Sequence, residues 1–192
     1  MRIVAGSARG RTLLAPKSQN IRPTADRVRE SLFNILGQWT DGLSVLDLYA
    51  GTGALALEAL SRGASHALLV DKDKEALALC RENSAALGFA AQVEIWAMPV
   101  ERAVERLGQE GRKFDLIFAD PPYALETADA LIAQIERAGL LGPEARLIFE
   151  HCKAEPAVER VGTLERFDRR LFGDTQVSFY SSAGGEPTRF VK

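Results

Sequence analysis

Val45-Leu46-Asp47-Leu48-Tyr49-Ala50-Gly51-Thr52-Gly53 is the stretch that decides the fold. It joins an apolar strand over 44–48 to a predicted helix over 54–61 through a turn with two glycines. Glycines at this place let the backbone come close to a ligand at the N-terminus of the following helix. The stretch therefore predicts a strand-turn-helix unit that opens an α/β region and binds a ligand at the carboxyl end of its sheet.

The same alternation continues along the chain. Further apolar strands are expected at 67–70, 93–96, 114–119 and 146–149, and helices at 74–86, 100–107 and 127–138. Near-continuous apolar strands that alternate with helices are typical of a parallel sheet covered on both faces. After residue 150 the segments 161–167 and 177–181 have no crossover helix between them, which predicts an antiparallel hairpin at one edge.

The first 40 residues form a separate part of the pattern. Residues 1–17 predict a β-hairpin in which 3–5 and 12–15 flank the Gly-rich basic connection 6–11. Residues 24–36 predict an amphipathic helix with Val28, Leu32 and Ile35 on one stripe. We therefore expect an N-terminal extension over 1–40 and a main domain over 41–192.

The composition excludes several classes of protein. The chain has 192 residues, is 46% hydrophobic and 26% charged, and has no apolar run near the roughly 18 residues of a membrane span. Its N-terminus has no signal-peptide pattern. Two cysteines and two histidines, without a CxxC or Cys/His cluster, argue for the reducing cytoplasm and against a zinc site or any other metal centre.

The charge of the chain is unevenly spread. Residues 1–40 carry seven basic and two acidic residues, a net +5, so the remainder carries −7 of the total −2. Such asymmetry suggests a basic face for a polyanion. A solvated surface that happens to be basic is the alternative.

Asp120-Pro121-Pro122-Tyr123 follows the strand over 114–119 and predicts the catalytic residues. The prolines fix the loop and lack N–H groups, so its carbonyls stay free to accept hydrogen bonds. Asp120 adds a carboxylate, and Tyr123 adds a face on which a base can stack. This combination suits a flat ring that carries an amine; the alternative is a tight turn with a buried tyrosine.

Two cofactors compete for the glycine turn. The segment 51–56 fits the dinucleotide fingerprint with a final alanine, and Asp71 lies at the expected offset for ribose hydroxyls. The other candidate is S-adenosylmethionine. Asp47 precedes the glycines, where it can meet an ammonium group but would repel a pyrophosphate. Together with the acid-Pro-Pro-Tyr loop, this favours S-adenosylmethionine; a purely structural turn stays open.

Motifs along nearly the whole chain resemble the RsmD-type 16S rRNA guanine-N2 methyltransferases, a family of class I S-adenosylmethionine-dependent enzymes. The segments that carry the resemblance are MRIVAG, RGR, RPTADRVRESLFNIL (22–36), VLDLYAGTGALALEALSRGA (45–64), FDLIFADPPY (114–123), FEH (149–151) and RRLFGDTQVSFY (169–180). The acid-Pro-Pro-Tyr motif is shared by many amine methyltransferases. Its combination with the segment 22–36 is far more specific.

The resemblance implies a Rossmann-like, seven-stranded, mostly parallel sheet with an antiparallel last strand, and a guanine target usually labelled guanine-966. It implies these cofactor-binding residues: Asp47, Tyr49, Gly51, Thr52, Gly53, Asp71, Lys72, Met98 and Asp120. Three positions depart from the family pattern. Ala56 replaces a glycine, Asp71 replaces a commoner glutamate, and Met98 stands where an acid is expected to face the adenine amino group.

The expected partner is 16S rRNA or the small ribosomal subunit, bound by a cytoplasmic monomer. Phosphates would be neutralised by arginines of the extension, namely Arg2, Arg9, Arg11, Arg22, Arg27 and Arg29. Two other functions remain possible at this point. One is a DNA adenine-N6 methyltransferase, which shares the acid-Pro-Pro-Tyr chemistry, and the other is a nucleic-acid-binding relative that has lost catalysis.

Overall fold

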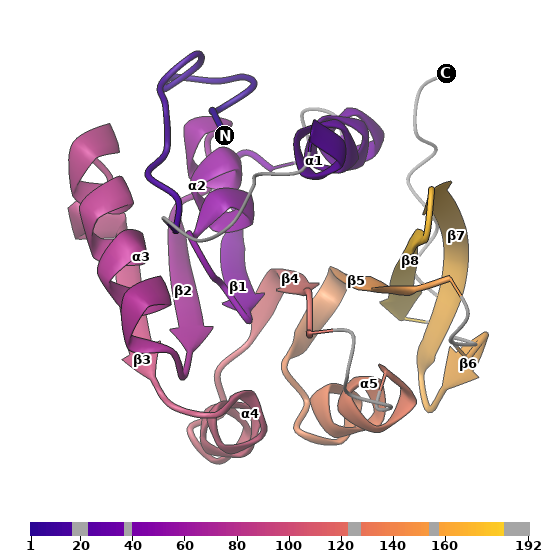
Figure 1. The fold of residues 1–192 in the computed structure, drawn as a ribbon. Coiled ribbons are helices and arrows are strands. Elements are labelled where there is room, and N and C mark those ends of the chain that lie inside the picture. The colour runs from indigo at the N-terminus through magenta and orange to yellow at the C-terminus, as the bar shows by residue number, and fades with distance from the viewer. Residues whose placement is uncertain (17–22, 37–39, 123–127, 154–157, 183–192) are drawn as a thin grey trace.

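The structure is a computed structural model that describes residues 1–16, 23–36, 40–122, 128–153 and 158–182, with the side chains of 23–27 outside the description. It forms one mixed sheet between two layers of helices (Figure 1). In the described residues, no helix combines the length and the apolar character that a membrane span requires.

The sheet has the strand order β3-β2-β1-β4-β5-β8-β7-β6. β1 (Ser44–Leu48), β2 (His66–Asp71), β3 (Val93–Ala97), β4 (Phe114–Ala119) and β5 (Leu141–Cys152) are parallel. β8 (Thr175–Ser182) runs antiparallel between β5 and β7 (Leu164–Phe172), and β6 (Arg160–Val161) pairs with β7. The predicted fold class is confirmed, and the two-residue β6 accounts for the eighth strand where seven were expected.

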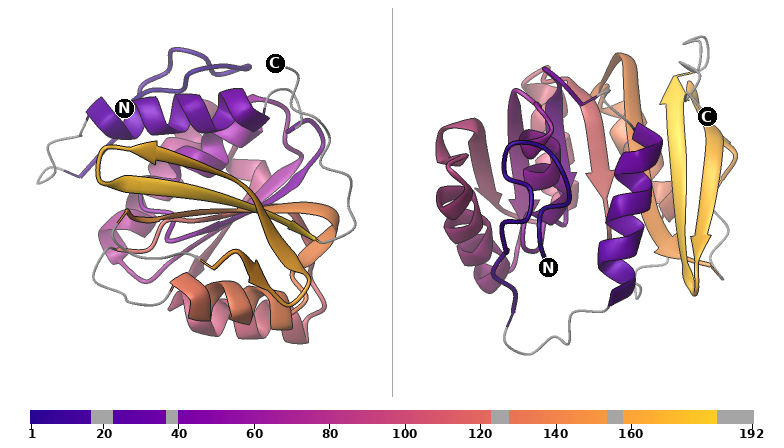
Figure 2. Two further views of the ribbon diagram at one scale, coloured as in Figure 1. Left: turned by 90° about the vertical axis from the view of Figure 1, so that its right-hand side faces the viewer. Right: turned by 90° about the horizontal axis from the view of Figure 1, so that it is seen from above.

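The helices divide between the two faces of the sheet (Figures 1 and 2). α1 (Pro23–Leu36), α2 (Ala54–Ser61) and α3 (Lys74–Leu87) contribute to one apolar cluster. α4 (Val100–Gln109) and α5 (Ala128–Arg137) contribute to the other, and a 3-10 turn, η1 (Ala90–Gln92), precedes β3. Because successive side chains of a strand point to opposite faces, Val45 packs in the first cluster while Leu46 and Leu48 pack in the second.

The predicted N-terminal β-hairpin is wrong in its extent. Only one bridge, between Arg2 and Thr12, joins the two arms within the described residues, and the backbone between them forms turns. Ile3, Ala8 and Leu13 are buried in the first apolar cluster. The two arms stop pairing because this segment packs on α2 and hydrogen-bonds to its side chains, as described below. Residues 1–14 therefore share a core with the sheet domain.

β5 is longer than its apolar run indicates. Gly142 and Pro143 suggest a turn before residue 146, yet β5 begins at Leu141. Its pairing with β4 shifts between Phe114 and Leu116, which accommodates the proline because Pro143 has no N–H to donate. At its other end β5 continues to Cys152, which pairs with Thr175 of β8. β5 therefore extends beyond Ala119, the last residue of its parallel neighbour β4.

Candidate active site

The carboxyl ends of β1, β2, β4 and β5 meet at one edge of the sheet, where a cavity of about 830 Å³ opens. Both motifs singled out in the sequence contribute to it. The predicted site residues that line it are Asp47, Tyr49, Gly51, Thr52, Asp71, Lys72, Asp120, Pro121 and Pro122. Strand order thus brings the glycine turn and the acid-Pro-Pro loop together, because β1 and β4 are neighbours.

The glycine turn is held in a conformation that most residues avoid. Tyr49, Gly51 and Gly53 have φ values of 63°, 56° and 77°. A Cβ at position 53 would also lie 2.9 Å from Leu69 Cδ2 and 3.3 Å from Leu57 Cδ1. Glycine is therefore required at 53 both by the backbone angle and by the space. The turn places residues 50–52 against the cavity, just before the start of α2.

Asp47 is a buried acid beneath this turn. Its residue is 2% exposed, and its Oδ2 accepts a hydrogen bond of 3.1 Å from the Ala56 N–H. Burial raises the pKa of Asp47 well above its ordinary value; the Ala56 bond opposes the rise, and the charges of Asp120 and Asp71 add to it. A cation beside Asp47 would favour the ionised form. The position therefore suits a ligand's ammonium group.

Asp71 ties the end of β2 to the glycine turn. Its Oδ2 accepts from the Gly51 N–H at 2.9 Å, and its Oδ1 accepts from the Asp73 N–H at 2.9 Å. An ionised carboxylate has about four acceptor sites, so both oxygens can still accept from ligand hydroxyls. The next residue, Lys72, is exposed at the cavity.

Asp120 begins the acid-Pro-Pro loop directly after β4. Its N–H donates to the Leu48 carbonyl at 3.4 Å, which holds the loop beside β1. The surrounding protein atoms partly desolvate the carboxyl of Asp120, and this burial raises its pKa to about 6. The residue as a whole is exposed to the water of the open cavity, which opposes the rise. Pro121 is buried and Pro122 is exposed. Tyr123 lies outside the described residues, so its stacking role stays a prediction.

Tyr49 and Glu101 form a pair in the cavity wall. Burial raises the pKa of Tyr49 to about 12, and the charge of Glu101 and its hydrogen bond to the phenol add to the rise. Met98 packs in the second apolar cluster, while Pro99, Val100 and Glu101 beside it line the cavity. The predicted contact of Met98 with adenine stays a prediction, and the acid found in this part of the wall is Glu101.

Comparison with known proteins assigns the chain to a family. Residues 1–181 match the family model described as "Conserved hypothetical protein 95". The chain belongs to this family. The Bacillus subtilis protein named "Putative rRNA methyltransferase YlbH" is 35% identical over 96% of this chain and 100% of its own length. The Escherichia coli K12 protein named "Ribosomal RNA small subunit methyltransferase D" is 39% identical over 78% of this chain and 74% of its own length.

Solved structures agree with this assignment. The Escherichia coli protein yhhF superimposes with a TM-score of 0.84 at 32% identity, covering 95% of this chain and 97% of its own. A Streptococcus pyogenes protein gives a TM-score of 0.75 at 35% identity over 80% and 94%. The predicted RsmD-type family and the predicted class I methyltransferase fold are therefore both confirmed.

Among the cavity residues that were not predicted as parts of a ligand site are Glu101, Glu150 and, in this role, Arg29. Glu150 lies within the FEH segment, so an acid at the end of an apolar strand was a signal available in the sequence. Glu101 has no such signal, because it lies in the first turn of α4, where acids are common. Arg29 was predicted for a different role.

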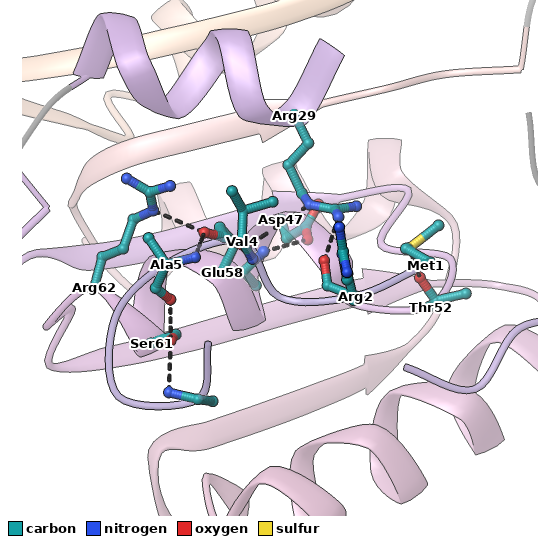
Figure 3. A network of polar contacts seen from close by, with 12 residues as sticks. Met1, Arg2, Val4, Ala5, Arg29, Asp47, Thr52, Glu58, Ser61 and Arg62 are labelled. Atoms are coloured by element: carbon teal, nitrogen blue, oxygen red, sulfur yellow. Dashed lines mark hydrogen bonds and ion pairs between the residues drawn. The ribbon is translucent and has the colours of Figure 1, made fainter. Parts of the chain in front are cut away.

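The network around Glu58 explains why the prediction for Arg29 is wrong (Figure 3). Arg29 is 3% exposed; its Nη2 donates to the Arg2 carbonyl at 2.6 Å, and its Nε lies 3.8 Å from Glu58 Oε2. A guanidinium buried in this way is not at the surface where phosphates bind. Arg29 instead joins α1 to the N-terminal segment and lines the cavity.

Glu58 is the centre of that network. Its carboxylate is fully buried and accepts from the Val4 N–H at 2.7 Å, the Ala5 N–H at 3.0 Å and Arg62 Nε at 2.8 Å. Asn83 makes a second connection, donating to the Leu14 carbonyl at 3.1 Å and to the Thr52 carbonyl at 3.0 Å. The N-terminal segment is therefore bonded to α2, to α3 and, through Asn83, to the glycine turn.

The other predicted RNA-binding arginines divide into two groups. Arg2, Arg9 and Arg11 are exposed, and Arg11 donates to the Ala86 carbonyl near the end of α3. Arg22 and the side chain of Arg27 lie outside the described part of the chain. Exposed arginines on a segment packed beside the cavity are compatible with RNA contact, which stays a prediction.

Proposed function

We propose that this protein transfers a methyl group from S-adenosylmethionine to the exocyclic N2 of a guanine in 16S rRNA of the small ribosomal subunit, with guanine-966 as the expected target. One observation carries the proposal. Asp47, the glycine turn and Asp71 share a single cavity with Asp120 and Pro121 in a member of this family. The names of both relatives describe rRNA methyltransferases, which supports rRNA as the substrate class.

The residues of the cavity fit S-adenosylmethionine. Asp47 offers a buried carboxylate for the ammonium group, and Asp71 offers acceptors for the ribose hydroxyls. The described lining contains more acids than bases: Asp47, Asp71, Asp73, Glu75, Glu101, Asp120 and Glu150 against Arg29 and Lys72. Such a lining favours a cationic sulfonium and disfavours the pyrophosphate of a dinucleotide. When bound, S-adenosylmethionine supplies an electrophilic methyl group.

The chain's own groups prepare the amine. The lone pair of the guanine amine is delocalised into the ring, so the amine must be aligned and its developing positive charge stabilised. The Asp120 carboxylate and the Pro121 carbonyl are the acceptors that we assign to its two hydrogens. Fixed positioning by a stiff loop supplies much of the remaining rate acceleration. The proton then leaves to Asp120 or to water, so no histidine base is needed.

The RNA must present its base outside a helix. An amine inside a duplex is not reachable, so the guanine is splayed from a loop or flipped, and Tyr123 is the residue that we assign to stack on it. Residues 1–40 form the proposed RNA-binding extension, with Arg2, Arg9 and Arg11 as phosphate ligands. We propose that the protein acts as a monomer in the cytoplasm, where the ribosomal subunit is found.

Mass mapping of modified nucleosides in small-subunit rRNA tests the proposal. A strain without the gene should lack one N2-methylguanine, and the wild-type gene should restore it. The Asp120→Ala gene should not restore it, although the variant should bind RNA as the wild type does. An unchanged set of rRNA nucleosides, or a lost N6-methyladenine in DNA, would rule out the proposal. Binding of S-adenosylmethionine to the purified protein separates an enzyme from an inactive relative.

A further inference from the structure

Glu150 lies beside Asp120 at the carboxyl edge of the sheet. β4 and β5 are parallel, and Ala119 pairs with Phe149. The next residues along the two neighbouring strands, Asp120 and Glu150, therefore lie at the same height on the sheet. Neighbouring strands are about 4.8 Å apart. Phe118 and Ile148, two residues earlier, both pack in the first apolar cluster, so Asp120 and Glu150 continue the same face of the sheet. Both line the cavity.

The surroundings of these two acids define a narrow kind of ligand. Val28 and Leu32 of α1 line the same cavity, and Pro121, next to Asp120, is buried. Glu150 is half-buried, and its strand is fixed by β4 on one side and by β8 on the other. This end of the cavity therefore combines apolar side chains with two adjacent carboxylates on rigid elements. A flat ring with two neighbouring hydrogen-bond donors matches it.

Guanine and adenine differ in this respect. Guanine presents its N2 amine next to an N1–H, so both neighbouring groups donate. Adenine presents its N6 amine next to an N1 lone pair, which a carboxylate would repel. We propose that Glu150 accepts a hydrogen bond from the N1–H of the target guanine while Asp120 accepts from its N2 amine, and that Glu150 thereby selects guanine. The inference rests on the proposed function and explains its choice of base.

A single-atom change in the substrate tests the role of Glu150. Small subunits are reconstituted from ligated 16S rRNA that carries either guanine or 2-aminopurine at the mapped nucleotide. 2-Aminopurine keeps the 2-amino group, but it lacks O6 and its N1 accepts instead of donating. The change in preference caused by a Glu150 variant, rather than the preference alone, therefore reports on the N1 contact. The wild-type protein should prefer guanine by roughly 10- to 100-fold in kcat/KM, the usual range for one well-placed base contact.

Glu150→Gln should reduce the ratio of kcat/KM for guanine to that for 2-aminopurine by about tenfold or more, because the glutamine amide can donate to N1 of 2-aminopurine. Glu144→Gln is the matched control: it makes the same chemical change on an exposed residue in the first half of β5 and should keep the wild-type preference. Calorimetric binding of S-adenosylhomocysteine should be the same for all three proteins, which shows that each is folded.

The outcomes separate the two levels of the proposal. Glu150→Gln with intact S-adenosylhomocysteine binding and the wild-type preference for guanine would overturn the role of Glu150 and leave the methyltransferase proposal standing. A wild-type protein that methylates neither substrate would overturn the proposed function itself. If Glu150→Gln does not fold, Glu150→Ala decides, since it removes the acceptor and should also reduce the preference for guanine; a folded Glu150→Ala protein with the wild-type preference would contradict the assignment.

Discussion

Glu58→Ala is expected to cause a large loss of stability. The change removes a fully buried carboxylate that accepts from two backbone N–H groups and from Arg62, and that forms an ion pair with Arg29 at 3.8 Å. Each N–H left without a partner costs about 1–3 kcal/mol. Removing one partner of a buried ion pair costs about 3–5 kcal/mol. Both effects come from the same carboxylate, so they overlap, and we expect the free energy of unfolding to fall by about 3–5 kcal/mol.

Thermal and urea unfolding measure this loss. For a domain of this size each kcal/mol corresponds to about 2–4 °C, so the melting temperature should fall by roughly 6–20 °C. Hydrogen exchange should also become faster at the Val4 and Ala5 amides, because both lose their acceptor. Glu82→Ala is the control: Glu82 is an exposed helical acid, and its loss should change stability by no more than about 0.5 kcal/mol. A Glu58→Ala protein as stable as this control would refute the assigned role of the carboxylate.

Three further predictions concern the cavity and the RNA face. The pKa of Asp47 is raised in the folded protein, so the stability that its carboxyl contributes is present below the unfolded pKa and is lost as the pH rises through the folded pKa. Asp47→Asn should therefore raise the melting temperature at pH 7, and the difference in melting temperature between variant and wild type should disappear at acidic pH. Calorimetry should show weaker S-adenosylmethionine binding by the variant. A lower melting temperature of the variant at pH 7 would contradict this reasoning. For Asp120, with a pKa raised to about 6, single-turnover methyl transfer should fall as the pH decreases through that value, because a protonated carboxyl is a weaker acceptor; a flat profile between pH 5 and 8 would exclude the carboxylate. Arg9→Ala with Arg11→Ala should weaken RNA binding and reduce its salt dependence, since both residues are exposed cations, and an unchanged slope in salt titrations would remove this segment from the RNA face.

The sequence by itself determined the local units of this protein. The alternation of apolar strands and helices predicted the parallel sheet, because strands with no polar face must be covered on both sides. Paired glycines after β1 predicted a close backbone turn, and Gly51 and Gly53 have the positive φ that this needs. Asp120-Pro121-Pro122 predicted a stiff loop at the end of β4, and that loop lines the cavity. Each of these follows from residues that are neighbours in the chain.

The tertiary structure decided which distant residues meet and which charges are buried. Arg29 has the same charge as Arg9, but α1 buries it against Glu58 at 3% exposure, and composition does not distinguish the two. Glu150 became part of the site only through the register of β4 and β5, which sets it beside Asp120. The predicted N-terminal hairpin is shorter than expected, because Glu58 of α2 accepts the backbone N–H groups of Val4 and Ala5. Burial and register depend on the packing of remote segments, and the local pattern of residues does not contain that information.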